Sequence, residues 1–186
     1  DLVEAETVSV FSLPSVGAAW SSVGALISVT VVGWLVASFG TALCVFNWRF
    51  SKISFFGLVF SFIYSDFGNE TVYNNSHTTK PLFYKISGTW GNHEGSLLLW
   101  LLVLTLFIFL FLVNSKNQPK KYRILTLLFQ EVIIIGFFLF LLKTSNPFNY
   151  LFPIPKEGLG LNPILQDPAL AIHPPLLYLG YVGSSI

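Results

Sequence analysis

Two histidines in loops between apolar segments are the residues best suited to chemistry. His93 lies within Lys85–Gly95, which reads KISGTWGNHEG, and His173 lies within Ile172–Leu176, which reads IHPPL. A neutral imidazole in either place can bind a metal ion or a haem iron. The third histidine, His77, lies in a polar stretch, where we expect it to be solvated.

Prolines on either side of His173 predict that this histidine is held rigidly. Residues 144–175 contain seven prolines, a density that disfavours a helix and favours extended backbone. The residue before a proline is restricted to extended conformations, and proline is preferred at the first helical position. A helix is therefore predicted to begin at Pro174, with His173 fixed at its start and Pro175 behind it. A rigid imidazole suits an axial haem ligand, but a solvated histidine at a membrane surface explains the same residues.

The segment around His93 allows two interpretations. In the first, Trp90 anchors the chain at a membrane surface, Asn92 or Ser96 caps the next helix, and Glu94 faces the positive helix end. In the second, the segment is a ligand or substrate-contact site, with a neutral His93 as a metal or haem contact. The local sequence leaves both open.

The composition indicates a membrane protein. Of the 186 residues, 53% are hydrophobic and 10% are charged, against about 25% charged residues in a soluble domain. The net charge is only +1, and no clustered basic face of the kind found in nucleic-acid-binding domains is visible, so we expect lipid and not nucleic acid as a partner. A single cysteine, Cys44, excludes an internal disulfide and a cysteine metal cluster.

The apolar runs predict an all-α, polytopic membrane protein. About 20 apolar residues cross the hydrocarbon core as a helix. We expect residues 1–186 to form a single membrane domain with four spans and the start of a fifth. Half a crossing cannot satisfy its last carbonyl groups in lipid, so we expect the fifth to need more chain or a partner protein. The predicted spans are residues 24–46, 50–67, 96–113, 124–142 and 174–186.

Basic residues predict which ends of the spans share a side. Asn47–Lys52 interrupts the apolar sequence and is assigned to a first loop, which carries Arg49 and Lys52. Residues 116–123 form a second loop with four basic residues. Short basic loops face the negative side of a membrane. Residues 66–95 and 143–173, two long loops that carry the histidines, are then predicted to share the positive side.

One ionisable residue, Glu131, falls inside a predicted span, and such a residue is a candidate for function. It lies close enough to the basic loop to reach water or to pair with Lys121 or Arg123. The sequence contains no glycine-rich phosphate loop and no CxxC pair, so it gives no support for phosphoryl transfer or thiol redox chemistry.

Three segments form a distinctive ordered set: WGNHEGSLLLW at Trp90–Trp100, TSNPF at Thr144–Phe148, and LNPILQDPALAIHPPLLYLGYVG at Leu161–Gly183. Together they resemble the N-terminal part of the CcmF family, the haem lyase component of system I cytochrome c maturation. The resemblance extends from about Phe55 to Gly183, and its motifs keep the family's order and spacing. Residues 1–50 resemble the family only in being apolar.

The resemblance implies that haem is held on the positive side for thioether attachment to apocytochrome c, with His173 as one axial iron ligand. Pro174, Pro175, Trp90 and His93 are the further candidates for haem binding. The family's tryptophan-rich WWD segment, its second external haem histidine and its two membrane histidines have no counterpart in residues 1–186. The implied partners are therefore the remaining CcmF portion with the WWD segment, a CcmE-like haem chaperone and apocytochrome c.

Activity is expected only in the complete haem lyase complex. SGTWGNHEG and AIHPP resemble mitochondrial versions, which implies the mitochondrial inner membrane, with a bacterial plasma membrane as the alternative. A different function stays open: a non-catalytic membrane subunit of a larger respiratory or assembly complex. A transporter half has less support, because only Gln130 and Glu131 are polar near the middle of a span.

Overall fold

The computed structural model describes the backbone of residues 16–185 and the side chains of residues 39–185. The described chain is helical and has no β-strand, only an isolated bridge between Asn69 and Tyr150. Residues 39–186 form one compact unit, to which all the contacts below belong. The elements in order are α1 (Val16–Tyr64), α2 (Glu70–Asn75), α3 (Leu82–Gly88), α4 (His93–Asn114), η1 (Ser115–Asn117), α5 (Lys120–Thr144), η2 (Pro163–Gln166) and α6 (Pro168–Gly183).

Three helices of the described residues are long and apolar enough to cross a membrane. They are Phe39–Tyr64, His93–Asn117 and Lys120–Thr144. This finding confirms the all-α membrane class. The number of crossings stays a prediction, and much of the predicted span 24–46 lies outside the residues whose side chains are described.

The loop predicted at Asn47–Lys52 is wrong, because α1 continues through it as a helix. The polar residues there are accommodated on the helix instead of ending it. Asn47 donates from Nδ2 to Glu131 Oε2 at 2.6 Å, and the Lys52 ammonium lies 4.7 Å from the centre of the Trp48 ring. No glycine or proline interrupts the segment. One of the two basic loops used to predict the orientation is therefore absent.

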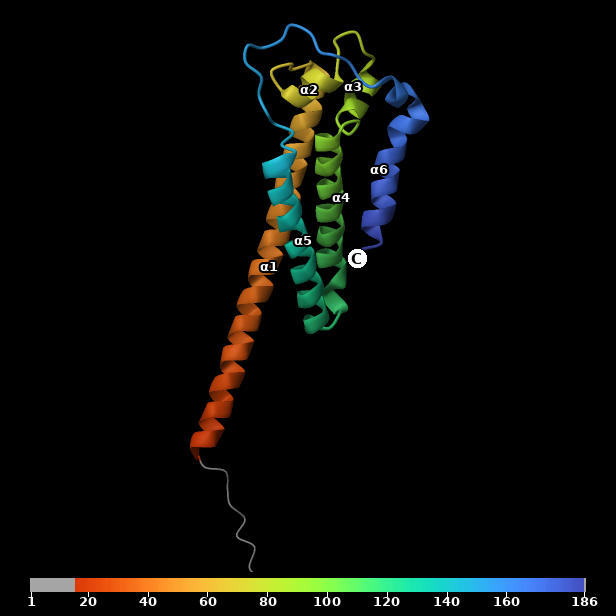
Figure 1. The fold of residues 1–186 in the computed structure, drawn as a ribbon. Coiled ribbons are helices and arrows are strands. Elements are labelled where there is room, and N and C mark those ends of the chain that lie inside the picture. The colour runs from red at the N-terminus through yellow and green to blue at the C-terminus, as the bar shows by residue number, and fades with distance from the viewer. Residues whose placement is uncertain (1–15, 186) are drawn as a thin grey trace, which may run out of the picture. The chain divides into compact units, whose positions relative to one another are not determined.

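Helix α4 packs against both α5 and α6, and it lies between them in Figure 1. Leu101 and Ile108 of α4 are fully buried, and their spacing of seven residues places them on one helix face. On the α6 side the approach is close, because a Cβ at Gly183 would come within 2.7 Å of the Phe107 ring. Direct packing on α4 thus helps to position α6 within the unit.

The connections gather at the two ends of these helices. Helices α2 and α3, the loop over residues 145–162 and η2 lie at one end, and η1 with the basic loop lies at the opposite end (Figure 1). Asn69 Nδ2 donates to the Pro147 carbonyl at 3.0 Å, which ties the two long loops together. The segments that carry the histidines therefore share one end, as predicted. The assignment of this end to the positive side stays a prediction.

Candidate functional site

His173 lies inside helix α6 and not at its start. The helix begins at Pro168, six residues before the predicted start at Pro174. Asp167 is the N-cap, and its carboxylate accepts from the main-chain N–H groups of Ala169 and Leu170 at 2.8 and 3.1 Å. An N-cap aspartate followed by proline at the first position is a strong start signal, and it overrides the extended preference expected before Pro174.

The two internal prolines leave main-chain carbonyl groups without their usual helical partners. A proline has no N–H to donate to the carbonyl four residues earlier. For Pro175 that acceptor is Ala171, which is buried. Trp90 supplies the missing donor, since its indole Nε1 lies 2.7 Å from the Ala171 carbonyl oxygen. The two segments predicted to carry the site are thus joined directly.

The turn that follows Trp90 makes a second contact with α6. Ser96 Oγ donates to the Trp90 carbonyl at 2.9 Å and lies 3.1 Å from the Tyr178 hydroxyl. Asn92 is the N-cap of α4, because its side chain accepts from Gly95 N at 2.7 Å. The helix-cap interpretation is therefore confirmed for Asn92, whereas Ser96 contacts α6 through Tyr178.

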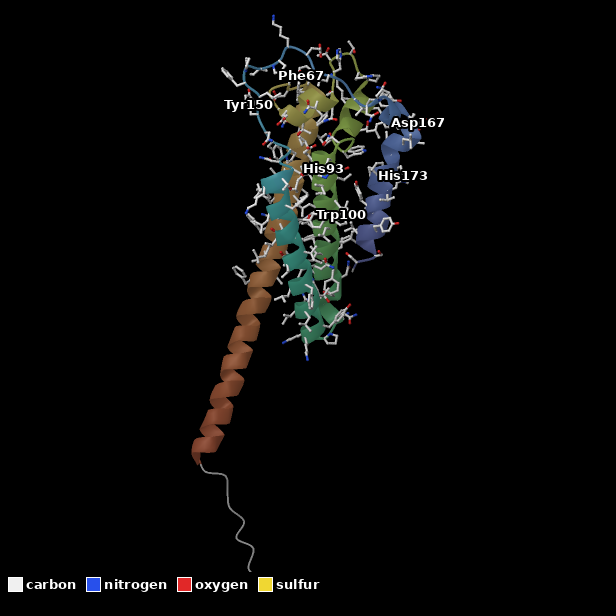
Figure 2. The ribbon with its side chains drawn as sticks, in the orientation of Figure 1. Phe67, His93, Trp100, Tyr150, Asp167 and His173 are labelled. Atoms are coloured by element: carbon white, nitrogen blue, oxygen red, sulfur yellow. The ribbon has the colours of Figure 1, made fainter. Side chains whose placement is uncertain are left out.

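The His173 side chain projects from the face of α6 that points away from α4. Residues of a helix follow one another at about 100°, so His173 lies nearly opposite the buried residues Ala171 and Val182. His173 is exposed, as are Leu176 and Leu177 beside it. Within residues 39–185 its ring has no hydrogen-bond or ion-pair partner. Figure 2 shows this residue on α6.

His93 belongs to a different part of the structure. It is the first residue of α4 and is exposed, and its Nδ1 lies 3.2 Å from Ser145 Oγ just after α5 (Figure 2). His173, by contrast, points away from α4, so the two imidazoles do not converge. No group of three or more His, Cys, Asp or Glu residues that could hold a metal ion occurs in the described part of the chain.

A small polar pocket of about 130 Å³ lies next to His93. Its lining combines two carboxylates with amide and hydroxyl groups from both long loops. The lining residues are Glu70, Thr71, Asn74, Asn75, Glu94, Thr144, Ser145, Asn146 and Asn149. The pocket marks the contact between these loops, and it is much too small for a haem.

A family model described as cytochrome C assembly protein matches residues 90–186, just over half of the chain. The chain belongs to the cytochrome c assembly protein family. The matched range of this family member begins at Trp90 and includes His173 and every α6 contact described above.

Individual relatives of this cytochrome c assembly protein are of the CcmF type. It is 53% identical over 133 residues to the cytochrome c-type biogenesis protein CycK of Rhizobium meliloti, covering 72% of this chain and 20% of the relative. It is 47% identical to CcmF of Haemophilus influenzae, covering 73% and 21%. Against CcmF of Escherichia coli the identity is 46%, covering 72% and 21%. The chain thus spans about a fifth of the length of these relatives. No solved structure matches it.

Glu131 of this cytochrome c assembly protein is buried between α1 and α5. The expected pairing with Lys121 or Arg123 is wrong for the arginine, whose guanidinium donates to the Leu112 carbonyl at 3.4 Å. The Glu131 carboxylate instead accepts from Asn47. Asn47 was assigned to a loop from the sequence, so this partner was missed. The pair joins two helices and lies away from both histidines.

The loop histidine His77 is partly exposed, and it also contacts two neighbouring polar side chains. Its Nδ1 lies 2.9 Å from Thr79 Oγ1 and 3.8 Å from Glu157 Oε1. Glu157 accepts from both the main-chain N–H and the hydroxyl of Thr78 at 3.0 and 2.7 Å. These hydrogen bonds from Thr78 hold the pKa of the Glu157 carboxyl below its usual value. The cluster fastens one long loop to the other.

Proposed function

We propose that this chain acts in cytochrome c maturation, as the part of a haem lyase that holds haem by an axial bond from His173. The observation that carries the proposal is the exposed imidazole on the face of α6 that points away from α4, the outer face, where it has no partner among residues 39–185. The relatives' description as cytochrome c-type biogenesis proteins supports the pathway. The haem lyase role is what the family resemblance implies.

The surroundings of His173 fit a flat, apolar ligand. Leu176 and Leu177 are exposed beside it, and one turn further along the same face a Cβ at Gly180 would meet nothing within 4 Å. At these positions the face of α6 beside the imidazole is therefore not covered by the described part of the chain. The iron would bind one nitrogen of the imidazole ring, and the two leucines would shield the haem from water beside it.

Haem is the substrate in this proposal, and its vinyl groups form thioether bonds with two cysteine thiols of apocytochrome c. The contribution of this chain is to hold the substrate in one orientation. A ligand on a helix, fixed by packing on the opposite face, limits the positions that the reacting groups can take. His173 is then a substrate-binding residue and not an acid or a base.

His173 supplies one of the two axial positions, and we assign the second to another polypeptide segment. His93 is directed toward Ser145 on the other side of α4, so it does not meet the same iron. We therefore propose that the chain acts together with the CcmF portion that bears the WWD segment. A CcmE-like haem chaperone and apocytochrome c are the expected further partners.

The chain is a membrane protein, and we propose a bacterial plasma membrane or a mitochondrial inner membrane as its location. The three relatives named above are bacterial, which favours the plasma membrane. The resemblance of motifs such as AIHPP to mitochondrial versions of the family favours the mitochondrial inner membrane instead. Fractionation of the source cells followed by immunodetection distinguishes the two.

The test uses the chain co-expressed with the remaining CcmF portion and the haem chaperone. The complex is purified from membranes, and haem per complex is measured by its Soret absorbance. We expect His173→Ala to reduce haem content severely, while His77→Ala, at the hydrogen-bonded loop histidine, keeps it. Unchanged haem content in the His173→Ala complex would show that the assignment is wrong.

A structural subunit is the second candidate, and one observation favours it. Trp90, Ser96 and Tyr178 all take part in packing contacts between α6 and the start of α4, so the motifs have a purpose without haem. Co-purification separates the candidates. Maturation factors bound to the native chain support the haem lyase, and respiratory subunits without them support a structural role.

A further inference from the structure

We propose that Trp90 is a positioning residue for His173, acting through the Ala171 carbonyl that Pro175 leaves free, and that it does not touch haem. This inference rests on the proposed function of His173. Its basis is the 2.7 Å hydrogen bond from the indole Nε1 to the Ala171 carbonyl oxygen. The family resemblance implies that Trp90 is a candidate for haem binding, and this proposal gives it a different role.

The Ala171 carbonyl needs a partner because it is buried in a helix that cannot supply one. Ala171 is 2% exposed, and the residue four positions later is Pro175, which has no N–H. A buried main-chain acceptor without a donor is strongly disfavoured, and more so in an apolar surrounding. Pro175 thus leaves the Ala171 carbonyl without its helical donor, and the Trp90 indole N–H donates to it instead.

Trp90 can serve as a fixed donor because it is itself held. Its ring packs against the buried hydrophobic cluster. The next residue, Gly91, is tightly enclosed, since a Cβ there would come within 3.1 Å of Leu165 and 3.2 Å of Leu161. The turn is then closed by the Asn92 cap of α4. A donor held in this way limits where α6 can lie.

A second contact from the same turn holds α6 beyond His173. The Trp90 carbonyl accepts from Ser96 Oγ, which also contacts the Tyr178 hydroxyl at 3.1 Å. Ala171 precedes His173 by two residues and Tyr178 follows it by five, and both lie on the α4 side of α6. The backbone that carries His173 is therefore held on both sides by contacts that lead to Trp90.

The same geometry argues against Trp90 as a haem contact. The indole lies against the inner face of α6, where it meets Ala171. The His173 side chain leaves the nearly opposite face, since the two residues are about 200° apart around the helix. A haem bound to His173 lies beyond that outer face, with the body of α6 between it and the indole.

The test is a double-mutant cycle between Trp90 and Pro175. Trp90→Phe removes the donor and leaves an aromatic ring. Pro175→Ala restores the main-chain N–H that bonds the Ala171 carbonyl within the helix. Once this helical donor is present, the indole N–H is no longer required. Trp90→Phe should therefore loosen α6 strongly in the chain that retains Pro175, and only slightly in the chain that also carries Pro175→Ala.

The first readout needs no haem. Amide hydrogen exchange across residues 168–183 is measured in the full complex before haem loading. We expect Trp90→Phe to accelerate exchange about tenfold, as the loss of one buried hydrogen bond implies, and Pro175→Ala to remove most of that acceleration. Equal effects of Trp90→Phe in both backgrounds would overturn the proposal.

The second readout is the haem-loaded complex. We expect Trp90→Phe to retain haem but to broaden the electron paramagnetic resonance signal of the ferric iron and shift its reduction potential, because the imidazole orientation is less restricted. The double variant should return both toward the unsubstituted values. A Trp90→Phe complex with an unaltered signal and potential contradicts the inference.

A third measurement covers the case in which Trp90→Phe does not fold. In the unsubstituted chain, a site-specifically ¹⁵N-labelled Trp90 indole N–H should exchange slowly with water, and rapid exchange overturns the inference. Failure of the proposed function has a separate signature. If His173→Ala keeps its haem while the Trp90–Pro175 coupling is present, the ligand assignment fails and the α6 contact stands. If His173→Ala loses haem and the Trp90–Pro175 coupling is absent, the ligand assignment stands and the proposed role of Trp90 fails.

Discussion

The hydroxyl oxygen of Ser96 lies 3.1 Å from that of Tyr178 and joins the first turn of α4 to the middle of α6. Ser96 has one hydroxyl hydrogen, which it donates to the Trp90 carbonyl at 2.9 Å. The Tyr178 O–H must therefore be the donor to Ser96. This direction makes the tyrosine hydroxyl, and not only its ring, necessary for holding α6.

Tyr178→Phe tests this direction. The ring and its packing remain, and only the donated hydrogen bond is lost, so we expect the chain to be destabilised by about 0.5–1.5 kcal/mol. Thermal unfolding in detergent measures it. Tyr181→Phe is the matched control on the same helix, because that side chain is 70% exposed. Equal stability of the two variants would argue against the Tyr178 contact.

Gly95→Ala tests the close packing of the turn that carries Trp90. A Cβ at this position would overlap the Thr89 carbonyl oxygen, which is main chain and cannot rotate away. We expect a loss of stability of about 1–3 kcal/mol. Gly136→Ala in α5 is the control, since a Cβ there meets nothing within 4 Å. Thermal unfolding should show that this variant is unchanged or gains up to about 1 kcal/mol from helix propensity.

The Asn47–Glu131 pair predicts which substitutions of Glu131 are tolerated. Glu131→Gln keeps an oxygen that accepts from Asn47 Nδ2, so we expect only a small effect. Glu131→Ala leaves the buried Asn47 amide without its acceptor. Hydrogen bonds between membrane helices contribute about 0.6–1.7 kcal/mol, and we expect a loss of that size in chemical unfolding. A smaller loss for alanine than for glutamine would contradict the pairing.

The loop contact between Thr78 and Glu157 should depend on pH. Hydrogen bonds from the Thr78 N–H and hydroxyl favour the charged carboxylate, so the pKa of Glu157 lies below its usual value. The stabilisation is present above the ordinary glutamate pKa and is lost as the pH falls through the lowered value. A ¹³C NMR titration of the Glu157 carboxyl, followed with the Thr78 amide, measures this. Glu157→Gln should abolish the pH response of the Thr78 amide. A carboxyl that titrates at the ordinary value counts against the contact.

The sequence was sufficient for α4 and α5, because their apolar length alone distinguishes them from any soluble element. It was misleading at Asn47–Lys52, where the basic residues Arg49 and Lys52 suggested a loop. Whether such residues end a helix depends on partners such as Glu131, which is 84 residues away in the chain. The start of α6 was assigned to Pro174, although Asp167 and Pro168 carried a stronger signal.

For the site, sequence motifs selected the right segments but not all of the roles. Trp90 and His173 could be chosen from residue type and spacing. The donor–acceptor relation between Trp90 and Ala171 spans 81 residues, and no local pattern contains it. Tyr178 was not singled out, since a tyrosine near a membrane surface has an ordinary explanation. The sequence shows that Pro175 has no N–H to donate, but it does not show that the Trp90 indole replaces that donor.

The central claim is that His173 binds the haem iron, and a change of ligand tests it most directly. In the haem-loaded complex, His173→Met should give the ferric absorption of a thioether ligand and a higher reduction potential, because a methionine ligand raises the potential of a histidine-ligated haem. His93→Met, on the other side of α4, should leave the spectrum and the potential unchanged. A His173→Met complex whose haem spectrum and potential match those of the unsubstituted complex would contradict the claim.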